Sequence, residues 1–185
     1  MTSSWHLREA AHRVHRGGVI AYPTEAVFGL GCNPDDQAAV ERIFEIKGRD
    51  AAKGLILIAA DVEQLLPYIG HLPPERETEI LATWPGPVTW IVPARPDTPP
   101  WLTGGRDTLA VRVTAHPVAA ALCRACGTAL VSTSANRSGH EPARNAMQLQ
   151  QRLGGTTDYV LPGRVGKQNK PTKILDARSG AVVRA

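Results

Sequence analysis

The sequence has few cysteines and no long apolar run, and both absences narrow the class of protein. Its three cysteines, Cys32, Cys123 and Cys126, are odd in number, which does not suit a framework of paired disulfides. No apolar stretch approaches the roughly 18 to 20 residues that cross a bilayer. The N-terminal residues lack a charged segment followed by an apolar core, so no signal peptide is expected. We therefore expect a water-soluble cytoplasmic protein with no membrane contact.

Several well-known catalytic signatures are also missing. The sequence contains no G-x-x-x-x-G-K-[ST] loop, no G-x-G-x-x-G between a strand and a helix, no H-E-x-x-H and no G-x-S-x-G. Cys123 and Cys126 have the spacing of a redox or metal pair, but no second Cys/His pair stands at ligand spacing. Packing within a helix is the favoured interpretation, and no metal-ligating residues are predicted. Any chemistry is expected to rest on positioning and charge stabilisation rather than on a covalent nucleophile.

The length and charge indicate one domain with an affinity for anions. A chain of 185 residues fits a single domain over 1–185. Lysine and arginine total 21 against 17 acidic residues, and most of the cations are arginines, which suit bidentate contact with phosphate or carboxylate. A solvated basic surface and a nucleic-acid patch explain this excess equally well, because binding depends on clustering.

Strand and helix patterns alternate along the chain, which predicts an α/β or mixed α+β fold: one twisted sheet with flanking helices. Helices are expected from Ser4 as N-cap to Gly17, from Asp35 or Asp36 through Lys47, and over 61–69, 74–84, 117–126 and 145–153. Strands are expected over 19–22, 55–58, 88–92, 109–113, 129–132, 159–161, 174–175 and 182–183.

The stretch 22–31, YPTEAVFGLG, converts the first strand pattern into a polar turn that contains glycine. Pro23 withholds a backbone donor, so the strand is expected to stop there. Gly29 and Gly31 are expected to allow backbone conformations that residues with a Cβ resist. Such a turn predicts a ligand site, with an ordinary strand-to-loop exit as the alternative.

Two cationic segments are further candidates. Lys47-Gly48-Arg49 places two cations just past a helix end, where they could bind phosphate oxygens or simply cap the helix. Arg112 lies within an apolar strand, so it needs either an internal carboxylate or an anionic ligand, and the ligand is slightly favoured. The basic loop 163–170 could close over an anionic ligand or remain a solvated surface loop.

The segment 132–139, STSANRSG, follows directly on an apolar strand. Hydroxyls, an amide and an arginine are concentrated there at a strand's carboxyl end, the usual location of ligand sites in α/β sheets. A capping turn is the alternative, and it explains fewer of these polar groups. We therefore predict a second binding loop here.

Five strings occur in order along the chain: PTEAVFGLG, KGR with KGLILI, WPGPVTWIV, TLAVRV followed by HP, and STSANRSG. Together they resemble the YrdC-like family over nearly the whole chain, and within it the short bacterial branch of threonylcarbamoyl-AMP synthases. The resemblance implies a YrdC/RibB-like sheet with a deep, basic concave face. It implies a nucleotidyltransferase that makes threonylcarbamoyl-adenylate and pyrophosphate from L-threonine, bicarbonate and ATP. The product serves threonylcarbamoyladenosine modification of tRNA, with partners related to TsaD, TsaB and TsaE.

The resemblance also assigns roles by position. Lys47 and Arg49 are the catalytic cations at the ATP phosphates, with Mg²⁺ expected to bridge those phosphates, and Arg112, Ser132 and Thr24 hold threonine. The remaining ATP-site residues are Thr108, Ser134, Asn136, Thr172 and Arg184.

Three departures from the family pattern matter. Ala26 stands where threonine is common, which leaves the selection of threonine open. Lys53-Gly54 replaces Asn-Pro, and Pro142 replaces a hydroxyl residue, both in keeping with the short branch. A non-catalytic module for tRNA or double-stranded RNA is the competing hypothesis, and direct tRNA contact stays open. Carbamoyl transfer as in HypF is disfavoured, since the zinc-finger and acylphosphatase portions of that family are absent.

Overall fold

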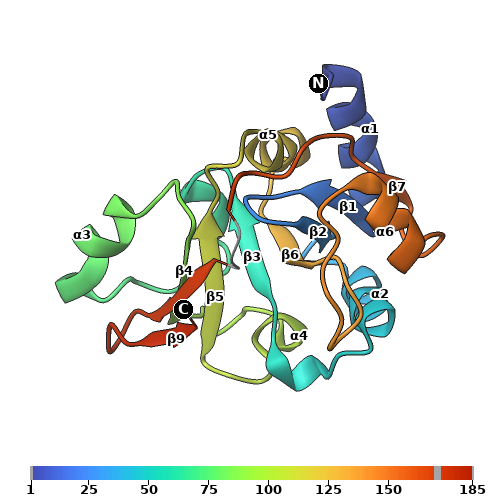
Figure 1. The fold of residues 1–185 in the computed structure, drawn as a ribbon. Helices are drawn as coiled ribbons and strands as arrows, with labels where there is room; N and C mark the ends of the chain where they lie inside the picture. The colour runs from blue at the N-terminus through green and yellow to red at the C-terminus, as the bar shows by residue number, and fades with distance from the viewer. Residues whose placement is uncertain (1, 169–171, 185) are drawn as a thin grey trace.

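The computed structural model describes residues 2–168 and 172–184, and the strands found there join in one mixed sheet (Figure 1). Neighbours pair antiparallel except for three parallel pairs, β1 with β7, β3 with β5 and β4 with β8. In spatial order the strands are β7 (Tyr159–Val160), β1 (Ile20–Pro23), β2 (Phe28–Gly31), β6 (Leu130–Ser134), β3 (Ile56–Ala59), β5 (Thr108–Val113), β4 (Val88–Pro93), β8 (Lys173–Asp176) and β9 (Val182–Arg184). The predicted mixed α/β fold is confirmed.

Helices cover both faces of the sheet. They are α1 (Ser4–His15), α2 (Gln37–Lys47), α3 (Pro74–Ala82), α4 (Pro100–Thr103), α5 (Pro117–Cys126) and α6 (Ala146–Leu153), with short 3-10 turns η1 (Ala51–Lys53) and η2 (Glu63–Leu65). Apolar side chains of α2, α3 and α4 pack with Leu57 and Val111 on one face. Those of α1 and α5 pack with Ile58 and Leu130 on the other, because strand residues alternate between faces. Apolar side chains of α6 pack with Ala21 and Leu30 of β1 and β2, which point away from Ile20 and Tyr22 of the second face.

Local signals set most element ends. Ser3, one residue before the predicted Ser4, caps α1, and Asp36 caps α2 through a hydrogen bond from the Ala39 amide. The predicted helix over 117–126 is confirmed as α5, and its two cysteines are buried and free, as is Cys32. No helix in the described part of the chain has the length and apolar character to cross a membrane.

Two predictions about secondary structure are wrong. The segment 61–69 forms only the η2 turn, because Pro67 lacks a backbone donor and disfavours helix at the residue before it. The stretch after Pro23 contains a strand, β2, which was not predicted because glycine, present twice in it, has a low strand propensity.

Gly29 and Gly31 are needed for space rather than for an unusual backbone. Neither has a positive φ. A Cβ at position 31 would lie 2.5 Å from the Val131 carbonyl oxygen and 2.8 Å from the Tyr22 ring. The buried Tyr22 side chain therefore packs across β2 only because glycine is there.

Candidate functional site

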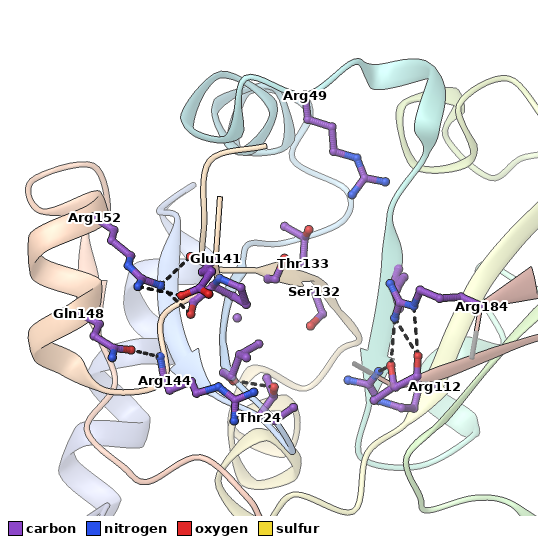
Figure 2. A pocket seen from close by; sticks show the side chains of 17 residues that line it. Thr24, Arg49, Arg112, Ser132, Thr133, Glu141, Arg144, Gln148, Arg152 and Arg184 are labelled. Atoms are coloured by element: carbon purple, nitrogen blue, oxygen red, sulfur yellow. Dashed lines mark hydrogen bonds and ion pairs between the residues drawn. The ribbon is translucent and has the colours of Figure 1, made fainter. Parts of the chain in front are cut away.

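A cavity of about 480 Å³ opens on the sheet face shared with α5, between the β1–β2 turn, α6 and the last strand (Figure 2). Its wall combines five arginines with hydroxyl groups and a few apolar side chains. Seven of the ten predicted site residues line it: Thr24, Arg49, Arg112, Ser132, Ser134, Thr172 and Arg184. The structure thus brings together segments from both ends of the chain.

Arg112 is buried and lines the cavity. We call Arg112 and its side-chain partners Glu25, Thr89 and Thr172 the floor of the cavity. Its Nη2 lies 3.3 Å from Glu25 Oε2, and Nη1 donates to the hydroxyls of Thr89 and Thr172 at 3.1 and 3.0 Å. Glu25 is also buried, and its other oxygen accepts a hydrogen bond from the Thr114 hydroxyl at 2.5 Å. The internal carboxylate expected as a partner of Arg112 is therefore present, and the anionic ligand stays a prediction for a side chain that also lines the cavity.

Thr172 links Arg112 to the last strand. The Arg184 guanidinium donates to the Thr172 carbonyl oxygen at 2.8 Å, beside the hydroxyl that accepts from Arg112. Figure 2 shows Arg112 and Arg184 side by side. Burial, then the positive charges of Arg112 and Arg49, lower the pKa of Arg184. Three cations that face one space favour an anionic ligand there.

Arg49 enters the cavity from the end of α2. Gly48 ends the helix in the left-handed conformation at φ 55°, so the capping interpretation of Lys47-Gly48-Arg49 is correct for the backbone. Arg49 Nη2 donates to the Gly54 carbonyl oxygen at 3.0 Å, while its Nε is buried without a partner among the described residues. Burial lowers the pKa of this guanidinium.

The second predicted binding loop follows β6 and forms another wall. Ser134 lines the cavity, and its hydroxyl donates a hydrogen bond to Asn136 Oδ1 at 2.5 Å. The Asn136 amide nitrogen donates in turn to the carbonyl oxygens of Arg137 and His140, at 2.8 and 2.6 Å. Arg152 on α6 donates to the carbonyl oxygens of Glu141 and Pro142. The loop is therefore held at both ends.

Three predicted site residues do not line this cavity. Lys47 is 3% exposed and lies behind the loop, and the Asn136 side chain is engaged within it. Thr108 lines a second hollow of about 370 Å³ together with Lys53. Ile56 lines both hollows, so a ligand that extends beyond the first cavity could reach Thr108 in the second.

Other functional candidates escaped the sequence analysis. Glu25 is the one carboxylate in the stretch 22–31, and the need of Arg112 for an anion was a usable signal for it. Arg144, Gln148 and Arg152 line the cavity from the α6 side, where the sequence pattern is that of an ordinary exposed helix. Nothing local distinguished them.

The segment 163–168 runs along the β1–β2 turn rather than away from the protein. The Gly166 amide donates to the Thr24 carbonyl oxygen at 2.9 Å, and the Gln168 amide donates to that of Glu25 at 3.2 Å. A Cβ at Gly166 would overlap the Glu25 carbonyl oxygen, so glycine is required. Residues 169 and 170 of the predicted closing loop lie outside the described residues.

Comparisons with known proteins agree on one family. The family model Sua5_yciO_yrdC, described as "Telomere recombination", matches residues 12–185. The threonylcarbamoyl-AMP synthase of Nitrosococcus oceani is 56% identical over 181 residues, which cover 98% of each chain. That of Alkalilimnicola ehrlichii is 56% identical over 187 residues, covering 100% of this chain and 97% of the relative.

Solved structures give the same result. P. abyssi Sua5 complexed with L-threonine superposes with a TM-score of 0.92 at 34% identity over 98% of this chain. The chain spans about half of that protein, 54% of its length. E. coli YciO superposes with a TM-score of 0.86 at 29% identity, covering 98% of this chain and 89% of YciO.

Proposed function

This chain belongs to the Sua5/YciO/YrdC family, and on that premise we propose that it works as a threonylcarbamoyl-AMP synthase. It is a nucleotidyltransferase that makes threonylcarbamoyl-adenylate and pyrophosphate from L-threonine, bicarbonate and ATP. The product supplies the threonylcarbamoyl group for threonylcarbamoyladenosine in tRNA.

One observation carries this proposal. The guanidinium groups of Arg49, Arg112 and Arg184 line the same cavity, together with hydroxyl groups from other segments. Cations brought together in this way are suited to a ligand that supplies negatively charged oxygens. A triphosphate beside an amino-acid carboxylate provides such oxygens in two places.

We assign the floor of the cavity to threonine. Arg112 binds the carboxylate, because its fork is already held by Glu25 and by two threonine hydroxyls. Ser132 and Thr24 supply hydroxyls around the zwitterion. We add Thr172, which the sequence resemblance places at ATP, because its hydroxyl accepts a hydrogen bond from Arg112. Ala26 and Val27 line the same cavity and offer apolar contact to the substrate methyl group.

We assign the rest of the cavity to ATP. Arg49 and Arg184 bind phosphate oxygens, and Ser134 orients the nucleotide. Asn136 acts through its hydrogen bond to Ser134. Thr108 contacts the part of the nucleotide that extends past Ile56 into the second hollow.

The reaction then depends on positioning and charge. The threonine amine takes up bicarbonate with loss of water, which gives an N-carboxylate. A carboxylate oxygen of this species attacks the α-phosphorus as the bond to the β-phosphate oxygen breaks, and pyrophosphate leaves. Arg49 stabilises the negative charge that develops on the phosphate oxygens.

The protein itself offers no cage for a divalent ion within the described residues. No group of three or more His, Cys, Asp or Glu side chains is placed to hold a metal there, and the lining carboxylate is the exposed Glu141. Mg²⁺ is therefore proposed to arrive with the ATP phosphates, whose oxygens it prefers. The partners proposed for the product are TsaD-, TsaB- and TsaE-like proteins in the cytoplasm.

The deciding experiment supplies the purified chain with ATP, labelled bicarbonate and one amino acid at a time. We expect labelled threonylcarbamoyl-adenylate, with pyrophosphate released only when threonine and bicarbonate are both present. The matched control is Arg49→Met, which should fold normally and release little pyrophosphate. ATP loss independent of threonine, or no product from any amino acid, would refute the proposal.

The competing RNA-binding function predicts a different outcome. A binding module would show no dependence on threonine, and its affinity for tRNA would fall steeply with salt, because counterion release dominates such binding. Measuring tRNA affinity at two salt concentrations beside the product assay separates an enzyme that touches tRNA from a module that only binds it.

A further inference from the structure

We propose that Lys47 is a positioning residue, which holds the turn at Ser134–Asn136 in its nucleotide-binding shape and does not itself contact the triphosphate. This inference rests on the proposed function for the identity of the ligand. It also divides the pair Lys47 and Arg49, two residues apart in the sequence, between two different tasks.

Every donor of the Lys47 ammonium is engaged by the loop. Its Nζ donates to the carbonyl oxygens of Ser134 and Asn136, at 2.5 and 3.0 Å, and to Asn136 Oδ1 at 3.3 Å. An ammonium has three donors, so these contacts use all of them. The side chain is 3% exposed and is absent from the described lining of both hollows.

The contacts of Lys47 lead directly to a group that faces the ligand. Asn136 Oδ1 accepts from Lys47 and from the Ser134 hydroxyl, and Ser134 lines the cavity. The main chain adds a further tie, since the Ser138 amide donates to the Lys47 carbonyl oxygen at 2.7 Å. Without the ammonium, two carbonyl oxygens would lose a charged donor and Asn136 Oδ1 would keep only the Ser134 hydroxyl, which weakens the turn.

The backbone explains why Arg49 does not share this role. Lys47 is the last residue of α2, and Gly48 then turns the chain through the left-handed region. Arg49 consequently leaves the helix in another direction and reaches the cavity, where its Nε remains without a partner among the described residues. Burial, and secondly the charge of Arg49, lower the pKa of Lys47 to about 8, as expected for a cation enclosed by protein.

The test compares nucleotides with increasing numbers of phosphates. Wild type, Lys47→Met, Lys47→Arg and Arg49→Met are titrated with AMP, ADP and ATP, with exposed Arg8→Met on α1 as a control for lost charge. A positioning role predicts that Lys47→Met weakens all three by the same factor, about tenfold or more, because the whole loop is disturbed. For Arg49→Met the loss should grow from AMP to ATP.

Lys47→Arg sharpens the test, since it keeps the positive charge but replaces three divergent donors with a planar fork. Positioning predicts a loss of AMP affinity here too, whereas direct contact with the triphosphate predicts near-normal AMP affinity. A loss for Lys47→Met that grows with phosphate number would overturn the proposal.

Hydrogen exchange of the ligand-free protein gives an independent readout. Amides of residues 135–143 should exchange faster in Lys47→Met and Lys47→Arg than in wild type, and unchanged exchange in both variants contradicts the positioning role. This measurement needs no nucleotide. A wild type that binds no ATP would therefore refute the proposed function without deciding the role of Lys47.

Discussion

The floor of the cavity and its loop wall hold their polar groups in different ways. On the floor, buried Arg112 is held by side chains, the Glu25 carboxylate and the hydroxyls of Thr89 and Thr172. In the wall, residues 134–143 are held mainly through main-chain oxygens, by Lys47 at one end and Arg152 at the other.

Because of this difference, we expect the floor to contribute to the stability of the whole chain and the wall to the local shape of the binding site. A charge buried on the floor must keep its partner, because a lone buried charge costs far more than a lost surface contact. The wall is nearer to solvent, and its carbonyl oxygens can turn to water when a brace is removed. We expect changes on the floor to affect folding of the whole chain and changes in the wall to affect ligand binding.

The largest expected effect is on the floor. Glu25→Ala leaves the Arg112 guanidinium buried without its carboxylate, so the free energy of unfolding should fall by about 3 to 5 kcal/mol. Urea unfolding measures it. The double variant Glu25→Ala with Arg112→Met removes both charges and should recover part of the loss. Equal stability of wild type and Glu25→Ala would remove the proposed contrast between floor and wall.

Arg112→Lys sharpens the functional side of the floor. Lysine keeps a positive charge but loses the planar fork that Glu25 and the two threonines orient, so apparent threonine affinity should fall about 100-fold. Product formation at varied threonine measures this change. ATP binding without threonine should change little, and a comparable loss for ATP would show that the two substrate assignments are mixed.

A smaller effect is expected in the wall. Arg152→Met removes the donor to Glu141 and Pro142, and should raise the KM for ATP a few-fold while lowering stability by less than about 1 kcal/mol. Glu141→Ala removes only an exposed ion pair, so it should leave both quantities nearly unchanged. A large loss of stability in Arg152→Met would show that the wall contributes as much to folding as the floor does.

The smallest expected effect is a pH dependence of stability that comes from His116. His116 is buried, accepts from the Ala119 amide as the N-cap of α5, and contacts the Arg164 carbonyl oxygen through Nε2. Burial lowers its pKa below the ordinary 6.5, so the folded state prefers the neutral ring. Below about pH 6.5 the unfolded chain takes up this proton first, and stability falls as pH decreases.

His116→Asn isolates that contribution, because asparagine can still cap the helix but does not titrate. The loss of stability between pH 7.5 and 5.5 in urea unfolding should be smaller in the variant than in wild type. An identical loss in both proteins would show that His116 takes no part in the acid response.

Much of the architecture could be predicted because its signals are local. Periodicity and caps gave the order of helices and strands, and the alternation of Ile56, Leu57 and Ile58 between faces follows from strand geometry. The helix expected over 61–69 overlooked a local signal, Pro67. The missed strand β2 depends instead on a distant contact, because it pairs with β6 as well as with β1, and no window around residues 28–31 contains β6.

By itself, the sequence determined which chemical groups the protein can use: a polar turn after the first strand, cations after α2, an arginine within a strand and a hydroxyl-rich loop. Only the tertiary structure decided their partners. Arg112 and Glu25 meet across 87 residues, and Lys47 and Arg49 face different environments although one residue separates them. The physical reason is that residue type fixes what a side chain can bind, whereas strand register and the turn at Gly48 fix the direction in which it points.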